Sequence, residues 1–192
     1  MTQIKNFNYS ENEVSMIIVD TTNGQYLWVG FKSDGSNCAL QKLSANEPTQ
    51  KYYDIDLAVS EIKKGYISSS YIYLALSDSA LIGRSYSLNN PLTVSVDFAL
   101  PVGISEAPID VLVNTNVYFL IPGAVSGTNT KIVEMTIAGV YVQTIDLSTV
   151  NNATSFCISD ADEFWVTTNE VIAEYVRVYP ISGGGYNYTI NT

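Results

Sequence analysis

Carboxylates that flank short apolar segments are the residues of this chain best placed to do chemistry. Asp20 and Asp160 follow such segments, Asp110 precedes one, and Asp162 lies two positions beyond Asp160. Glycosidases work with two carboxylates about 5–10 Å apart. Side chains at the ends of segments that surround one central channel could reach that separation. Asp110 stands at the opposite end of its segment from the others, however, which places it at the other end of such a channel. We therefore predict turn-forming aspartates and no catalytic residue.

Two loop segments carry the oxygen ligands that Ca²⁺ prefers, Asp160-Ala161-Asp162-Glu163 and Asp34-Gly35-Ser36-Asn37. Neither has the ligand spacing of an EF-hand loop. A β-turn is the simpler interpretation of both segments, and we predict no metal site.

The chain lacks the residues that several kinds of catalytic chemistry need. The chain has no histidine, which removes Ser–His and Cys–His nucleophiles and most zinc and iron sites. Its arginines are Arg84 and Arg177, too few for a cluster that binds sialic acid or phosphate. Gly183-Gly184-Gly185 fits a flexible turn rather than a phosphate loop, and Cys38 and Cys157 are predicted to be buried free thiols. The sequence predicts neither an enzyme nor a cofactor.

The charge balance excludes other classes of function. The net charge is −10, and no basic cluster is larger than Lys63-Lys64, so we predict neither nucleic-acid nor membrane binding. No apolar run is long enough for a transmembrane helix. The first ten residues have one lysine and no apolar stretch, which predicts no secretory signal and synthesis in a host cytoplasm.

The elements that would position these residues form a fourfold repeat. Four similar aromatic or apolar segments contain Leu27, Tyr73, Tyr118 and Phe164, which are 46, 45 and 46 positions apart. Each repeat divides into four short strands joined by polar turns, with no helical periodicity. Repeats of this length built from strands alone are typical of β-propellers. We predict an all-β, β-propeller-like fold with four blades of four antiparallel strands and about 46 residues per repeat.

The repeats define the domain organisation. Residues 1–13 form an N-terminal arm and residues 14–192 a single domain, with repeats at about 14–58, 59–103, 104–150 and 151–192. A ring must close or have its end blades covered. A single four-bladed ring is favoured, and a larger ring made by two chains is the alternative.

The surface composition points to a structural role. Only 15% of residues are charged, fourteen are tyrosine, and Ser, Thr and Asn supply much of the remaining polarity. In repeats and composition the chain resembles β-propeller-like structural proteins of tailed bacteriophages. That resemblance implies a non-enzymatic virion component, such as a capsid decoration, tail or fibre-associated protein. It also implies localisation in the virion and partners that are other virion proteins or copies of the chain, so that the protein works as an oligomer or in a larger assembly.

A carbohydrate-binding, lectin-type propeller is the alternative function. Such a protein would bind sugars with Tyr and Trp faces and with Asn and Asp hydrogen bonds. Trp28 and Trp165 each follow the matched repeat residue by one position, whereas Leu74 and Phe119 stand there in the middle repeats. This irregularity favours core packing over four equivalent sugar sites.

Overall fold

Sixteen β-strands make up the regular structure of the residues that the structure describes. The computed structural model describes residues 13–20, 26–32, 38–47, 50–59, 61–123, 129–147, 150, 152–169, 174–182 and 188–191, with the backbone alone at 174–175 and 188–191. Among these residues no helix is long and apolar enough to cross a membrane. The predicted turn at 34–37 and the glycine run 183–185 lie outside the described residues, as does the predicted N-terminal arm apart from residue 13.

The strands form four sheets of four strands each, and every sheet pairs strands in the order in which they follow one another in the chain. The first two sheets contain β1 (Glu13–Asp20), β2 (Tyr26–Lys32), β3 (Cys38–Ser44), β4 (Lys51–Leu57), β5 (Glu61–Ser68), β6 (Tyr71–Ser77), β7 (Leu81–Ser87) and β8 (Val94–Ala99). The last two contain β9 (Asp110–Val113), β10 (Val117–Ile121), β11 (Thr130–Met135), β12 (Tyr141–Leu147), β13 (Ala153–Ile158), β14 (Glu163–Asn169), β15 (Glu174–Pro180) and β16 (Tyr188–Asn191). All strand pairs are antiparallel. The prediction of an all-β fold with four antiparallel sheets is confirmed.

Strand composition follows the position of each strand in its sheet. Every residue of β10, Val-Tyr-Phe-Leu-Ile, is buried, because this second strand of the third sheet is covered on both faces. The outermost strand β4 alternates instead: Ile55 and Leu57 are buried, whereas Asp54 and Asp56 are exposed. Period-two alternation of this kind belongs to a strand with one face in the core and one in water.

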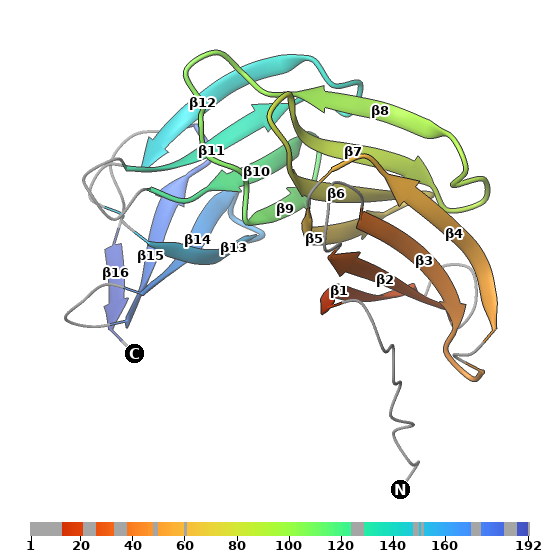
Figure 1. Ribbon diagram of the computed structural model, residues 1–192. Helices are drawn as coiled ribbons and strands as arrows, with labels where there is room; N and C mark the ends of the chain where they lie inside the picture. Colours follow the sequence, from red (N-terminus) through yellow and green to blue (C-terminus); the bar gives the residue numbers. More distant parts are fainter. Residues whose placement is uncertain are drawn as a thin grey trace, which may run out of the picture.

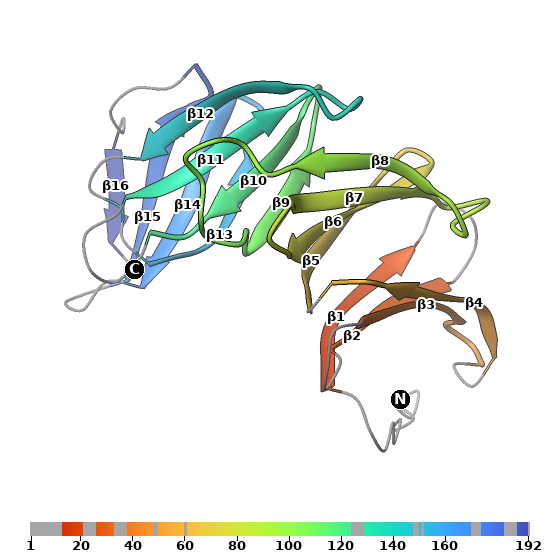
Figure 2. The same ribbon diagram turned by 45° about the horizontal axis from the view of Figure 1, so that its top comes forward.

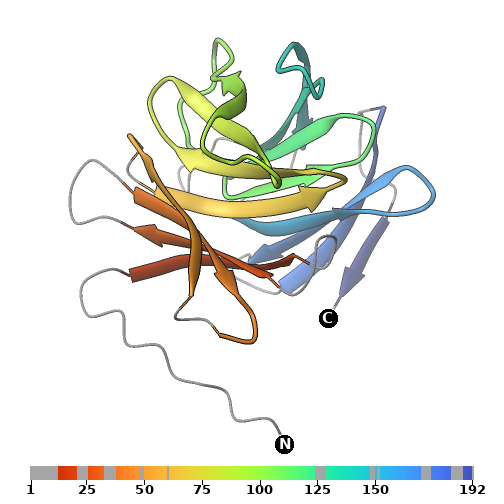
Figure 3. The ribbon, with the colours of Figure 1, turned by 90° about the vertical axis from the view of Figure 1, so that its right-hand side faces the viewer.

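The four sheets follow one another in an arc, with their first strands on its inner side (Figures 1 and 2). β1 contacts β5, β5 contacts β9, and β9 contacts β13. A separate apolar cluster fills each junction between successive sheets. Figure 1 shows the outermost strands β4, β8 and β12 on the outer side of the arc, and Figure 3 views the molecule from the side on which the first sheet lies.

The arc does not close on itself. In the described part of the chain the extensive contacts of β1 are with β2 and β5, and none joins β1 with β13. The first and last sheets stand at the two ends of the arc in Figure 1. The single closed four-bladed ring that the repeat count favoured is therefore not what the described residues form.

The repeat register differs from the predicted one in two sheets. Tyr73 and Tyr118 each face the following sheet, as predicted for equivalent positions. Leu27, however, lies on the face of the first sheet that points away from the second, and Phe164 faces backward onto the third sheet. The equivalent residues are Trp28, Tyr73, Tyr118 and Trp165. The matched set Leu27, Tyr73, Tyr118 and Phe164 is therefore wrong by one position at both ends. With the corrected register an aromatic residue stands at this position in every sheet, and the irregularity of the two tryptophans disappears.

Phe164 nevertheless supports the third junction. Its side chain is fully buried, with ring centroids 5.2 Å from Tyr118 and 6.0 Å from Phe156. We expect Phe164→Ala to lower the free energy of unfolding by about 3–5 kcal/mol, because the truncation removes apolar contacts and leaves a cavity. Chemical denaturation measures this change. Val140→Ala, at a residue that is 62% exposed, is the control and should cost less than about 0.5 kcal/mol. Equal losses in the two variants would contradict the assigned packing.

Candidate functional site

Asp20 belongs to a buried polar cluster at the first junction. Its carboxylate accepts a hydrogen bond from Trp28 Nε1 at 3.3 Å and lies 3.8 Å from Lys42 Nζ. Lys42 also donates to the carbonyl of Leu88 in the second sheet at 3.2 Å, and its ammonium lies 4.4 Å from the ring centroid of Tyr26. Burial lowers the pKa of Lys42, and the charge of Asp20 opposes that shift. Asp20 is therefore part of a cluster that links two sheets. The turn after it, residues 21–25, lies outside the described residues, so the predicted turn-forming role of Asp20 stays a prediction.

Asp110 makes a similar link at the third junction. It is 4% exposed, and its Oδ2 accepts hydrogen bonds from Ser155 Oγ at 2.7 Å and from the Phe156 amide at 3.4 Å. Its Oδ1 accepts from the amide of Val111 at 2.9 Å. This carboxylate ties β9 to β13, so the turn interpretation is wrong for Asp110. As predicted, Asp20 ends its strand and Asp110 begins its own.

Asp160 and Asp162 do occupy a turn, the one between β13 and β14. Ser159 Oγ accepts from the amides of Ala161 and Glu163 at 3.2 and 3.3 Å, and Asp162 adopts a φ of 56°. Both carboxylates are exposed. Throughout the described residues, no three His, Cys, Asp or Glu side chains come together in a group that could hold a metal ion.

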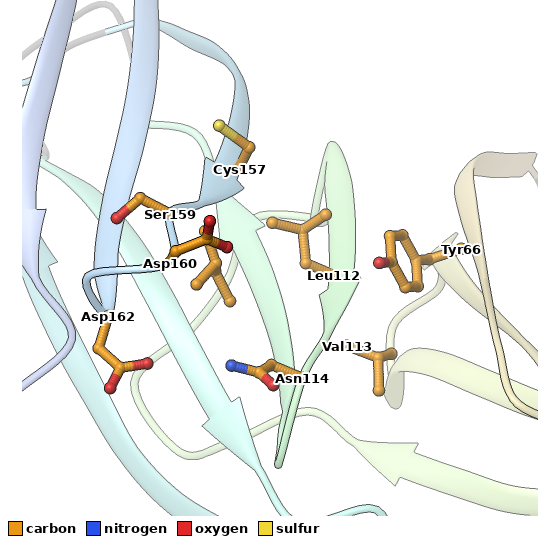
Figure 4. Close-up of a pocket in the computed structure, with 9 residues that line it drawn as sticks. Tyr66, Leu112, Val113, Asn114, Cys157, Ser159, Asp160 and Asp162 are labelled. Carbon is orange, nitrogen blue, oxygen red and sulfur yellow. The ribbon is translucent and has the colours of Figure 1, made fainter.

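An open pocket of about 440 Å³ lies on the inner side of the arc, where the first strands of three sheets meet. Its lining residues are Tyr66, Leu112, Val113, Asn114, Cys157, Ile158, Ser159, Asp160 and Asp162. Figure 4 shows Tyr66 on one side, the two aspartates on the other, and Asn114 between Asp162 and Val113. Asp160 and Asp162, selected from the sequence as candidate ligands, thus line a pocket. Tyr66 and Asn114 were missed, because the sequence does not reveal that β5 and β9 converge on this turn.

The two thiols differ in exposure. Cys38 is buried as predicted, and burial raises its pKa to about 11. Cys157 is exposed, which corrects the prediction of a buried thiol. It pairs with Trp165 across β13 and β14, on the face of the last sheet that no further sheet of this chain follows.

Glu134 organises a third polar cluster, inside the third sheet. Its Oε1 accepts from Tyr118 OH at 3.3 Å and from Asn116 Nδ2 at 2.6 Å, and its Oε2 accepts from Gln143 Nε2 at 2.7 Å. Burial raises the pKa of Tyr118 to about 12, with a further contribution from the negative charge of Glu134. The phenol therefore stays protonated over a wide pH range and donates to Glu134.

An apolar groove of about 520 Å³ lies on the outer side, between the end of β8 and the β11–β12 turn. Its lining residues are Ala99, Leu100, Pro101, Val102, Met135, Gly139 and Tyr141. Gly139 has a φ of 82°, and a Cβ there would lie 2.8 Å from Val96 Cγ1 and 2.9 Å from the Asp97 carbonyl oxygen. Only glycine allows the turn to approach β8 so closely. We call Val102, Ile137, Val140 and Tyr141 the outer apolar surface; their side chains are 106%, 56%, 62% and 49% exposed.

No protein-family model matches the chain, and no curated protein sequence matches it. Solved structures do resemble it, among them a chain of the "Crystal structure of the eukaryotic initiation factor", with a TM-score of 0.50 and 8% sequence identity. The likeness covers 93% of this chain and 55% of the other, so this chain spans about half the length of the one it matches. At this identity the comparison concerns the fold alone: successive antiparallel sheets in an all-β protein.

The raised pKa of Tyr118 makes stability depend on alkaline pH. The unfolded chain releases the phenol proton near the ordinary tyrosine pKa of 10.0, whereas burial raises the pKa of Tyr118 in the folded protein to about 12. The stabilisation is complete below the unfolded value and is lost as pH rises toward the folded one. Between pH 9 and 11 we expect the wild type to lose more free energy of unfolding than Tyr118→Phe, as measured by urea denaturation. Parallel pH profiles would contradict this assignment.

Proposed function

We propose that this chain is a β-propeller-like, non-enzymatic binding module that works as a structural part of a larger assembly. Four meander sheets with adjacent first strands support the propeller description. The use of the buried carboxylates supports the non-enzymatic role. Asp20 and Asp110 are engaged in links between sheets, while Asp160 and Asp162 share one exposed turn.

The outer apolar surface is the observation that carries this proposal. Two of its four exposed residues, Val102 and Tyr141, line a groove whose lining is mainly apolar, and Ile137 and Val140 belong to the turn between β11 and β12. Contiguous exposed apolar surface of this kind marks sites of protein–protein interaction. The occupant that fits is an apolar side chain from a neighbouring protein subunit, inserted between Val102 and Tyr141.

The virion assignment is the narrower form of the proposal, supported by the repeats, the low charged fraction and the resemblance to phage structural proteins. Particles produced from the genome that encodes the chain should contain it at a fixed copy number, measured by quantitative mass spectrometry of purified particles. Its presence in infected cells together with its absence from the particles would overturn the virion assignment.

The binding role can be tested without knowing the partner. A displayed library of random peptides selected on the purified protein should yield sequences with apolar anchors. The double variant Val102→Ser/Tyr141→Ser should lose at least tenfold in affinity for them, because its groove can no longer bury an apolar anchor. Leu92→Ser, at a residue that is 66% exposed and outside the groove, is the matched control and should bind as the wild type does. Failure to select any peptide, or equal binding by all three proteins, would contradict the proposal.

Carbohydrate binding is a second candidate function, and the inner pocket favours it. Tyr66 offers an aromatic ring there, and Asn114, Asp160 and Asp162 offer hydrogen-bonding groups. A glycan array probed with the purified protein should then show binding that Tyr66→Ala abolishes and Leu92→Ser leaves unchanged. An array with no signal above background would eliminate this candidate.

A further inference from the structure

The inner pocket has two sides of different chemistry. Tyr66, Leu112 and Val113 supply an aromatic and apolar side. Asp160 and Asp162 lie opposite Tyr66, and Figure 4 shows the phenol oxygen of Tyr66 directed toward them across the pocket. A ligand that fills this space therefore meets an apolar surface on one side and two carboxylates on the other.

The two carboxylates are not engaged within the part of the chain that the structure describes. Neither Asp160 nor Asp162 forms an ion pair with a described residue or accepts a hydrogen bond from one. The buried carboxylates of Asp20 and Asp110, in contrast, are taken up by the links between sheets. The charge of the two pocket aspartates is thus available to a ligand.

A third carboxylate adds to the negative potential on this side of the pocket. Burial raises the pKa of Tyr118, and the charges of Glu134 and Asp162 raise it further. The charge of Asp162 therefore acts on the same phenol as Glu134, whose Oε1 lies 3.3 Å from Tyr118 OH. None of the described residues that line the pocket is a lysine or an arginine. The pocket therefore favours a positively charged ligand.

We propose that the ligand of the inner pocket is an amino sugar, a sugar ring that carries a protonated amine. This inference rests on carbohydrate binding, the second candidate function, and narrows the class of sugar. The ammonium group binds to Asp160 and Asp162. The sugar ring lies against Tyr66 and Leu112, and the side-chain amide of Asn114 bonds to a hydroxyl group.

Charge and size select this class over other sugars. A neutral sugar would desolvate two carboxylates without neutralising them, which is unfavourable, whereas an ammonium group forms charge-assisted hydrogen bonds with them. A sugar with carboxylate or sulfate groups would be repelled by the pocket and by the net charge of −10. The volume of about 440 Å³ is at the lower end of the range for small-molecule sites, which suits about one or two sugar rings.

A matched pair of oligosaccharides tests the role of the amine. The trimers of glucosamine and of N-acetylglucosamine have the same rings and linkages, but only the glucosamine trimer carries ammonium groups. At low salt and about pH 6, where amines of this kind are protonated, isothermal titration calorimetry compares their affinities. We expect the glucosamine trimer to bind at least about fivefold more tightly, since exposed ion pairs each contribute modestly.

The outcomes separate this inference from the function on which it rests. Equal affinities, or tighter binding of the acetylated trimer, would overturn the amino-sugar class and leave carbohydrate binding as a candidate function. Absence of binding by both trimers would overturn the inference and the candidate function together.

Charge-neutral variants test the location. Asp160→Asn/Asp162→Asn keeps the shape of both side chains, and asparagine tolerates the φ of 56° at position 162. This variant should lose the preference for the glucosamine trimer and bind the acetylated trimer as the wild type does. Asp56→Asn/Asp146→Asn removes the same charge from exposed positions of β4 and β12, and it should keep the preference. Equal losses in the two variants would show that net charge alone attracts the ligand, which would overturn the assigned site.

Two further measurements separate the ammonium group from the sugar ring. Raising the salt from about 0.05 to 0.3 M should weaken binding of the glucosamine trimer and not of the acetylated trimer, because salt screens exposed charges. Salt-independent binding of the glucosamine trimer would contradict the role of Asp160 and Asp162. The compound 1,5-diaminopentane carries ammonium groups without a ring and should bind more weakly, because it cannot cover Tyr66. A diamine that binds as tightly as the glucosamine trimer would overturn the assignment of a sugar.

Discussion

Contact between the apolar faces of successive sheets is the interaction on which the rest of the structure depends. A four-stranded meander has two faces, and here both carry apolar residues in the two middle sheets. Neither face can remain in water, since burial of each large side chain contributes about 1.5–3 kcal/mol. Each sheet is therefore stable only against its neighbours, as in other repeat proteins. The Lys42 and Asp110 clusters and the inner pocket lie where neighbouring sheets meet in this stacking.

The relative placement of neighbouring sheets is fixed in different ways at the three junctions. The first contains Lys42, whose ammonium reaches the carbonyl of Leu88 in the next sheet, and the third contains Asp110, which holds Ser155. The second relies on aromatic packing instead, with the rings of Phe98 and Phe119 5.4 Å apart. A buried charge is costly unless it is paired, so the two polar links favour one relative placement of their sheets over others. The aromatic packing at the second junction allows more adjustment in the relative placement of its two sheets.

The strands and their grouping into four sheets could be predicted from the sequence, because the regular spacing of the aromatic segments is kept in the sheets. It was insufficient for the register of the first and last sheets. When both faces of a strand are apolar, as around Trp28 and Phe164, alternation no longer tells which face a residue occupies, and a one-residue error exchanges the faces. The sequence also did not show that Asp20 and Asp110 are buried. An aspartate at the end of a strand gives the same sequence pattern whether its side chain bonds to a turn or faces a neighbouring sheet. Nothing in the sequence indicated that Lys42 is buried, because lysine in an alternating strand normally faces water.

The strictly sequential pairing of strands has a consequence for folding during synthesis of the protein. Every sheet is made from one continuous stretch of chain, so each can begin to form as soon as it leaves the ribosome. The first sheet emerges with the Trp28 side uncovered and must wait for residues 61–99. At about 5–20 residues per second that interval lasts roughly 2–8 s. During this time the nascent first sheet exposes apolar residues that will later form its core, and exposed surface of this kind favours aggregation.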